Sequence, residues 1–202
     1  MMSFDQFQTR AGLIPYQYHH PRFLYALVRW LQPATVVEVG SHIGMSAVWL
    51  ARGLQETGVG LLHCIDSFCW TDQAQEEQWY RNVTECGVAD YVRLIKGRST
   101  EVAWPRPVDM VFIDANHTYP AVKADTELAL AAGATCVVFH DSATYEGVNR
   151  YVKELRETLD RRVWETLEVT ADQGLFVLHK IPDPVPLINF DRDEQWDRPD
   201  VK

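Results

Sequence analysis

The stretch "VVEVGSHIGMSAVWLA", residues 36–51, changes character halfway along its length. Its first four residues are mostly β-branched and apolar, which is typical of a buried strand. Gly40 and Gly44 interrupt the run, and "MSAVWLA" continues with apolar residues at helical spacing. This order of strand, glycine turn and helix predicts a backbone that can approach a ligand, with the helix N-terminus offering free N–H groups to an anionic group.

Around this stretch, apolar strand-like runs alternate with helical patterns, which predicts a parallel sheet covered by helices. The expected parallel strands are Thr35–Val39, Leu61–Ile65, Tyr91–Ile95, Val108–Ile113 and Thr135–Phe139. The expected helices are Ile43–Gln55, Asp72–Thr84, Ser99–Ala103, Pro120–Ala132 and Tyr145–Leu159. Two later runs, "RVWETLEVT" and "GLFVLHK", predict an antiparallel strand pair at the sheet edge. The expected fold class is therefore α/β: a Rossmann-like, doubly wound, seven-stranded sheet, mostly parallel with an antiparallel C-terminal strand pair.

The patterns divide the chain into three parts. Residues 1–34 are expected to form an N-terminal helical extension, because "HHPRFLYALVRWLQP" combines a capping residue, an early proline and helical spacing. Residues 35–181 form one α/β domain, and residues 182–202 form a tail rich in Pro and Asp that predicts an extended arm or a disordered end. His20, before Pro21, is interpreted as the N-cap of the first helix rather than as a catalytic residue, and His19 is set aside with it.

Composition narrows the class of ligand. A chain of 202 residues that is 47% hydrophobic can bury one sizeable core, and a net charge of -9 argues against a nucleic-acid partner. No apolar run approaches the roughly 18 residues of a membrane span, and the N-terminus lacks the apolar stretch of a signal peptide. Four cysteines without CxxC spacing indicate reduced thiols: Cys64, Cys69, Cys86 and Cys136. We expect a cytoplasmic protein that binds a small molecule; a homo-oligomer stays open.

Acidic and glycine residues at the strand ends point to the kind of ligand. Glu38, Gly40 and Gly44 form E-x-G-x-x-x-G, not the G-x-G-x-x-G of a dinucleotide fold. Asp66 ends the second strand, where an acid can accept hydrogen bonds from ribose hydroxyls, and "KGRS" at residues 96–99 follows the third strand, where it could line an adenine pocket. Each feature alone is common, since glycine pairs form turns and acids cap helices. Together they favour a cofactor that contains a nucleoside.

The same order, continued by "VDMVFIDANH" and two closing strands, resembles class I S-adenosylmethionine-dependent methyltransferases. More narrowly, the opening stretch is similar to that of catechol O-methyltransferase and its metal-dependent relatives. The segment "FIDANHTYPAVKADTELAL" followed by "VVFHD" is similar to small-molecule and sugar O-methyltransferases, and the resemblance covers residues 36–180. It implies a methyltransferase domain at residues 35–181 and S-adenosylmethionine as cofactor. The cofactor-binding residues that it implies are Glu38, Gly40, Ser41, Gly44, Ser46, Asp66, Ser67, Phe68, Gly97, Arg98, Ser99 and Asp114.

In this resemblance the parts of the cofactor have different partners. Glu38 and Gly40 flank the methionine part, Ser41 and Ser46 bind its carboxylate, and Asp66 takes the ribose. The adenine would contact the segment after the third strand, with the two residues after Asp66 alongside.

Four polar residues follow the fourth and fifth strands, whose ends meet in one crevice of a doubly wound sheet. They are Asp114, His117, His140 and Asp141. We assign Asp114, His140 and Asp141 as ligands of a divalent metal and His117 as general base. The metal would lower the pKa of an acceptor hydroxyl while the base removes its proton.

His117 stands three residues after Asp114, the offset at which the catechol enzyme carries its catalytic lysine. The His-Asp pair at 140–141 replaces the Asp-Asn pair of that enzyme. A histidine ligand admits Mn, Fe, Zn or Ni beside Mg. A metal-free site, in which His117 or His140 acts alone as base, stays an alternative.

The predicted function is transfer of a methyl group to a hydroxyl of a small molecule, such as a sugar, a natural product or a catechol. Aromatic residues near the crevice either wall the acceptor pocket or pack in the core: Tyr16, Tyr18, Trp70, Trp79 and, foremost for the pocket, Tyr145.

Three alternatives stay open. A nicotinamide oxidoreductase would need another glycine where His42, Ile43 and Met45 stand. A non-haem iron oxygenase could use His117, His140 and a carboxylate as a facial triad. A binding module without turnover would keep the cofactor pocket alone.

Overall fold

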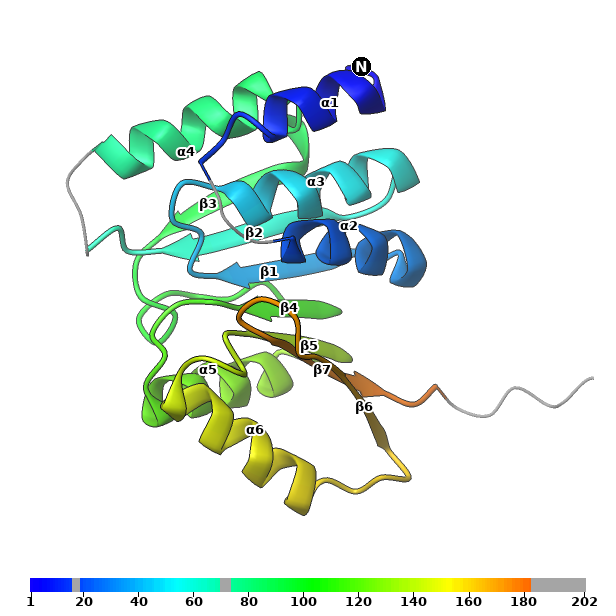
Figure 1. The fold of residues 1–202 in the computed structure, drawn as a ribbon, viewed down its shortest axis with the longest axis vertical. Helices are drawn as coiled ribbons and strands as arrows, with labels where there is room; N and C mark the ends of the chain where they lie inside the picture. The colour runs from blue at the N-terminus through cyan, green and yellow to red at the C-terminus, as the bar shows by residue number, and fades with distance from the viewer. Residues whose placement is uncertain (16–18, 70–73, 183–202) are drawn as a thin grey trace, which may run out of the picture.

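The computed structural model describes residues 1–15, 19–69 and 74–182 and contains one sheet of seven strands (Figure 1). The strands are β1 Thr35–Val39, β2 Leu61–Asp66, β3 Val92–Lys96, β4 Met110–Ile113, β5 Cys136–His140, β6 Trp164–Val169 and β7 Leu175–Lys180. Their order is β3-β2-β1-β4-β5-β7-β6, and β7 runs antiparallel to both of its neighbours. The predicted fold class, including the antiparallel C-terminal pair, is confirmed.

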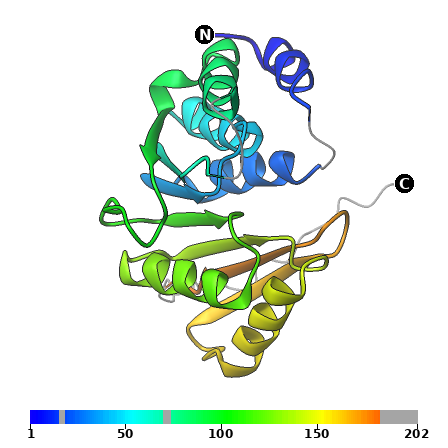
Figure 2. The same cartoon turned by 90° about the vertical axis from the view of Figure 1, so that its left-hand side faces the viewer.

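Helices cover both faces of the sheet. They are α1 Phe4–Ala11, α2 His20–Leu31, α3 Met45–Thr57, α4 Ala74–Glu85, α5 Tyr119–Ala131 and α6 Glu146–Thr158, with a short 3₁₀ helix at Ala89–Tyr91. Figure 2 shows α1 to α4 on one side of the sheet and α5 and α6 on the other. Each layer encloses its own cluster of buried apolar side chains.

Strand β1 shows why the sequence forms a two-sided core. Val36 packs into the cluster beneath α1 to α4, whereas Val37 and Val39 pack into the cluster beneath α5 and α6. A parallel strand that is buried on both faces needs apolar residues at successive positions, and "VVEV" meets that need except at Glu38. Glu38 is nevertheless fully buried, which marks it as a residue with a special role.

One predicted helix is wrong. Residues 99–103 form a turn, not a helix, because the carbonyl of Arg98 accepts bonds from the N–H groups of Glu101 and Val102 and the pattern stops there. Pro105 and Pro107 follow, and proline has no N–H with which to continue a helix.

The sequence patterns also gave no separate helix at the N-terminus, whereas the structure has α1. Ser3 caps it: its hydroxyl accepts from the N–H of Gln6, and the Gln6 side chain accepts from the N–H of Ser3.

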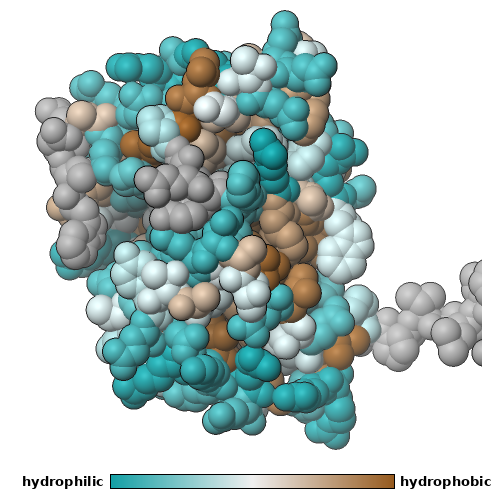
Figure 3. Space-filling model, in the orientation of Figure 1, coloured by the Kyte–Doolittle hydropathy of each residue, from teal (hydrophilic) through white to brown (hydrophobic). Residues whose placement is uncertain are grey.

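The surface gives little sign of a docking site on the face drawn in Figure 3. That face is largely hydrophilic, with separate small apolar areas, and single exposed apolar residues are ordinary on globular proteins. Among the described residues, no helix is both long enough and apolar enough to cross a membrane.

Candidate active site

A cavity of about 490 Å³ lies beyond the carboxyl ends of β1, β2, β3 and β4. The strand order reverses between β1 and β4, and ligands of doubly wound sheets bind at such a reversal. The cavity lining includes eight of the residues predicted for the cofactor: Gly40, Asp66, Ser67, Phe68, Gly97, Arg98, Ser99 and Asp114. The structure thus brings together segments that are separated by up to 74 positions in the sequence.

Asp66 organises one wall of this cavity. Its Oδ2 accepts hydrogen bonds from the backbone N–H groups of Ser41 and His42, each at 2.8 Å, and its Oδ1 accepts one from the N–H of Phe68 at 2.7 Å. A carboxylate offers about four acceptor positions, so about one remains, on Oδ1. The acid at the end of β2 therefore ties the turn after β1 to the loop after β2.

The other four predicted cofactor residues, Glu38, Ser41, Gly44 and Ser46, do not line the cavity. The hydroxyl of Ser41 donates to Glu38 and accepts from Nε1 of Trp79. Burial raises the pKa of Glu38 to about 7, although hydrogen bonds from Ser41, Ser46 and Cys64 act in the opposite direction. The buried side chains of Glu38, Ser41 and Trp79 thus stabilise the turn after β1 through hydrogen bonds inside the protein.

Trp79 and four other aromatic residues were candidates for the acceptor pocket. Trp79 is 2% exposed and packs in the core. Tyr16, Tyr18 and Trp70 lie outside the described residues, as do residues 183–202 of the predicted tail and the first two residues of the helix predicted at 72–84.

The four polar residues after β4 and β5 converge at the edge of the cavity. Asp114 follows β4 directly, His140 ends β5, and Asp141 comes next. Nδ1 of His140 lies 3.2 Å from Oδ1 of Asp114 and 3.3 Å from Oδ1 of Asp141. Nε2 of His117 lies 2.7 Å from Oδ2 of Asp141 and 3.5 Å from Oδ1 of Asp114. The sheet topology thus produces one compact cluster of carboxylates and imidazoles.

Opposite charges dominate the protonation of this cluster. Burial lowers the pKa values of His117 and His140, but Asp114 and Asp141 raise them more, to about 9 and about 10 respectively. Burial raises the pKa of Asp141, but the two histidines lower it to about 2. The two carboxylates and the two imidazoles thus favour each other's charged forms.

The cluster fits a divalent cation. Asp114, His140 and Asp141 each offer a ligand atom, and these atoms lie within 4.8 Å of one another. In the described part of the chain, Oδ1 of Asp141 and Nε2 of His117 are buried without a hydrogen bond of good geometry. Asp141 also has a positive φ of 62°, and such backbone conformations are frequent at functional sites. Two carboxylate oxygens and one imidazole nitrogen suit Mn, Fe, Zn or Ni as well as Mg.

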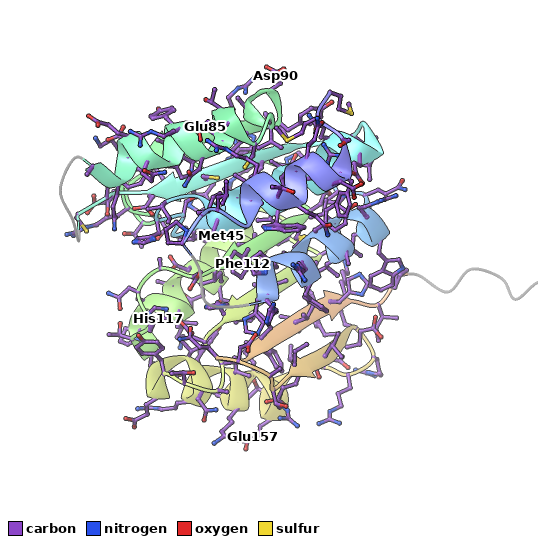
Figure 4. The ribbon with its side chains drawn as sticks, turned by 45° about the horizontal axis from the view of Figure 1, so that its top comes forward. Met45, Glu85, Asp90, Phe112, His117 and Glu157 are labelled. Atoms are coloured by element: carbon purple, nitrogen blue, oxygen red, sulfur yellow. The ribbon has the colours of Figure 1, made fainter. Side chains whose placement is uncertain are left out.

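Tyr145 covers one side of the candidate base. Its ring stacks on that of His117, with centroids 4.1 Å apart and planes 13° from parallel. Figure 4 shows His117 at the edge of the molecule where the loop before α5 meets the start of α6. The tyrosine is 45% exposed, so part of its side chain is open to solvent.

His20 is the residue whose role the sequence patterns misassigned. The N-cap of α2 is His19, and His20 is the first residue of the helix, with a side chain that is 4% exposed. Nδ1 of His20 lies 3.0 Å from Nε2 of His140, and Nε2 of His20 lies 3.0 Å from the carbonyl oxygen of Ala171. Burial lowers the pKa of His20. The N-cap prediction for His20 is therefore wrong, and the pair "HH" before Pro21 is the only sequence signal at this place.

Comparison with known proteins gives the site a family context. A family model described as a methyltransferase domain matches residues 37–142. A curated protein from Mycobacterium sp. (strain KMS), named "Putative O-methyltransferase", is 35% identical over 97 residues, which are 46% of this chain and 41% of the relative. The chain thus spans about two fifths of the length of the curated relatives it matches.

Solved structures share the fold. The O-methyltransferase TomG from Streptomyces achromogenes, involved in tomaymycin synthesis and solved with SAM, is 22% identical with a TM-score of 0.65, covering 89% of this chain and 91% of TomG. An O-methyltransferase from Bacillus cereus, solved with SAH, is 18% identical with a TM-score of 0.64, covering 90% and 92%.

Proposed function

The chain belongs to the methyltransferase-domain family whose model matches its residues 37–142, and from this premise we propose that it is an S-adenosylmethionine-dependent O-methyltransferase that acts on a small molecule. The observation that carries the proposal is the position of the cavity. It lies at the strand reversal, and Asp114 belongs both to its lining and to the adjoining cluster of carboxylates and imidazoles. A methyl donor in the cavity would have a possible base and cation site beside it.

S-adenosylmethionine fits the cavity by size and by donor chemistry. A volume of about 490 Å³ is in the range of cofactor sites. The remaining acceptor position on Oδ1 of Asp66 would take one ribose hydroxyl, and Gly97, Arg98 and Ser99 would line the adenine. Gly44 has no side chain to cap α3, so the first N–H groups of that helix are candidates to bind the cofactor carboxylate. Ser41 and Ser46, buried under the turn, would then support these groups. TomG and the Bacillus cereus enzyme, solved with SAM and SAH, support this choice of cofactor.

In the proposed reaction, the acceptor oxygen forms a bond to the methyl carbon as the carbon–sulfur bond of the cofactor breaks. The sulfonium becomes a neutral thioether. The hydroxyl proton would pass to Nε2 of a neutral His117, the form favoured once a bound cation balances the charges of Asp114 and Asp141, and then to solvent. Asp114, His140 and Asp141 would hold a divalent cation, which lowers the pKa of an acceptor hydroxyl when bound. Tyr145, stacked on His117, would hold the base in position.

The same site supports a proposal for the class of acceptor. A hydroxylated small molecule, such as a sugar, a natural product or a catechol, would reach the cluster from the side of Tyr145. The net charge of -9 disfavours a nucleic-acid acceptor. The family model describes a methyltransferase, which favours this function over the nicotinamide oxidoreductase and the iron oxygenase.

Calorimetry with S-adenosylmethionine tests the proposal. Metal-stripped wild-type protein should bind the cofactor, and Asp66→Asn should bind it at least tenfold more weakly, because the amide loses charge at an acceptor of three backbone bonds. Asp90→Asn, an exposed aspartate in the 3₁₀ helix, is the matched control and should match the wild type. Wild-type protein that binds no S-adenosylmethionine, with or without Mg²⁺ or Mn²⁺, would overturn the proposed function.

The metal part of the proposal needs its own measurement. Mn²⁺ titrated into the cofactor complex should give a further heat that Asp141→Asn abolishes. A methyl-transfer assay with catechol and sugar acceptors should then respond to chelation by EDTA. Turnover that is indifferent to EDTA and to Asp141→Asn would favour His117 or His140 as a lone base instead.

A further inference from the structure

We propose that His20 is a positioning residue: it keeps the proton of His140 on Nε2 and so presents Nδ1 of His140 to the cation. The inference rests on the proposed function, because the cation site belongs to it. Its physical basis is a chain of three contacts that runs from Ala171 through His20 and His140 to the carboxylates of Asp114 and Asp141.

The first contact fixes the proton on His20. Nε2 of His20 lies 3.0 Å from the carbonyl oxygen of Ala171. A carbonyl oxygen has no hydrogen to give, so Nε2 of His20 must be the donor. Asp172 neighbours this nitrogen, but its carboxylate lies 3.9 Å away, outside hydrogen-bond distance. The ring is buried, and burial favours its neutral form. A neutral ring that is protonated on Nε2 has a lone pair on Nδ1.

The second contact transmits this choice to His140. Nδ1 of His20 lies 3.0 Å from Nε2 of His140, and both side chains are buried. Since Nδ1 of His20 is an acceptor, Nε2 of His140 must donate, and it must keep its proton to do so. Nδ1 is therefore the nitrogen of His140 that is left to face the carboxylates and the cation site.

The third contact shows why this matters at the cluster. Nδ1 of His140 is the atom that approaches Asp114 and Asp141, at 3.2 and 3.3 Å. Two carboxylates at that distance favour a proton on Nδ1, and a protonated Nδ1 cannot bind a metal. Loss of the acceptor on His20 would therefore make a proton on Nδ1 of the neutral His140 ring more favourable. With His20, that arrangement leaves two acceptor nitrogens facing each other, which is unfavourable.

The relay also assigns a role to segments outside the family match. His20 lies on α2 and Ala171 in the loop between β6 and β7, and neither belongs to residues 37–142. In many proteins a histidine that binds a metal through one ring nitrogen donates the N–H of the other to an outer partner. Loss of that partner weakens metal binding by about 10- to 100-fold. The N-terminal extension would thus complete the cation site from outside the matched domain.

Nuclear magnetic resonance of metal-free, ¹⁵N-histidine-labelled protein tests the proton assignment directly. A coupling across the N–H···N bond should connect His20 and His140, with the proton covalently attached to Nε2 of His140. A proton attached to Nδ1 of His20 would overturn the inference, whether or not the protein is a methyltransferase. This readout requires neither cofactor nor metal.

Mn²⁺ affinity, measured by calorimetry, tests the consequence. His20→Leu should weaken binding about 10- to 100-fold. His20→Gln should stay within a fewfold of wild type, because its amide can accept from His140 and donate to Ala171. His19→Leu is the matched control, since the His19 side chain makes no capping bond, and it should leave the affinity unchanged.

The outcomes separate the two proposals. Equal losses in His20→Gln and His20→Leu, with thermal unfolding unchanged, would overturn the relay and leave His20 a packing role. Wild-type protein that binds no Mn²⁺ would overturn the proposed cation site and with it the metal half of this inference, while the resonance data would still decide the direction of the hydrogen bond.

Discussion

Replacement of Gly40 by alanine tests the contact between the ends of β1 and β4. Gly40 has a φ of +86°, and a Cβ added there would lie 2.3 Å from the carbonyl oxygen of Asp114 and 2.7 Å from Cα of Ala115. Both of these are backbone atoms, so no side-chain rotation can relieve the contact. The alanine must push the turn after β1 away from the segment that carries Asp114.

Two terms set the size of the effect. A left-handed φ costs a non-glycine residue about 1–2 kcal/mol, and forced overpacking costs a further 1–3 kcal/mol or so. We therefore expect Gly40→Ala to lower the free energy of unfolding by about 2–5 kcal/mol. Gly58 is a matched control, since its φ is +69° and an added Cβ would meet nothing within 4 Å. Gly58→Ala should cost only the first term, about 1–2 kcal/mol.

Urea unfolding, followed by tryptophan fluorescence, measures both variants. Calorimetry with S-adenosylmethionine adds a second readout, because a displaced Asp114 alters the cavity wall. Gly40→Ala should bind the cofactor more weakly, and Gly58→Ala should bind it as the wild type does. The reasoning would be refuted if the two variants unfolded with free energies within about 0.5 kcal/mol of each other, a difference typical of neutral surface changes.

Three further predictions use the same unfolding measurement or its local counterpart. The pKa of Glu38 is raised from 4.5 to about 7 in the folded protein, so the free energy of unfolding should fall as pH rises through this window, by up to about 3 kcal/mol. Glu38→Gln should flatten that part of the pH profile. An unchanged slope in this variant would contradict the assignment to Glu38. Trp79→Phe removes the 2.7 Å bond from Nε1 to the hydroxyl of Ser41 and should cost about 1 kcal/mol in urea unfolding, whereas no loss would show that water replaces the bond. Ser3→Ala removes the capping box of α1 and should cost about 1 kcal/mol, seen as faster hydrogen exchange in α1 alone; unchanged exchange there would show that packing holds α1.

Local sequence patterns predicted correctly those helices and strands that depend mainly on residues within the same segment. The strand predicted at Thr35–Val39 is β1, residue for residue, because a strand buried on both faces is apolar at nearly every position. The helix after it was predicted from Ile43 but begins at Met45, since Gly44 has a positive φ of 83° and cannot belong to the helix. The prediction of a helix at 99–103 failed because a single turn satisfies the same local pattern before the prolines.

The site was predictable where it depends on topology alone. Parallel strands bring their carboxyl ends to one edge, so residues after β4 and β5 had to meet, and Asp114, His140 and Asp141 do. His20 could not be found in this way. Its contact with His140 spans 120 positions and depends on where α2 docks on the sheet. A histidine before Pro21 satisfies an N-cap pattern equally well, so local reasoning had no ground to prefer the distant partner.

The turn after β1 is held by carboxylates from two sides. Asp66 accepts from the N–H groups of Ser41 and His42, and Glu38 accepts from the Ser41 hydroxyl. Each bond lies within the protein, so the turn needs no ligand to take its shape. A preformed loop loses little conformational entropy on binding, which favours affinity for any molecule that fits the cavity. The same bonds explain why Ser41 lies outside the lining: its hydroxyl proton is directed at Glu38, and a cofactor carboxylate would therefore bind at backbone N–H groups rather than at this side chain.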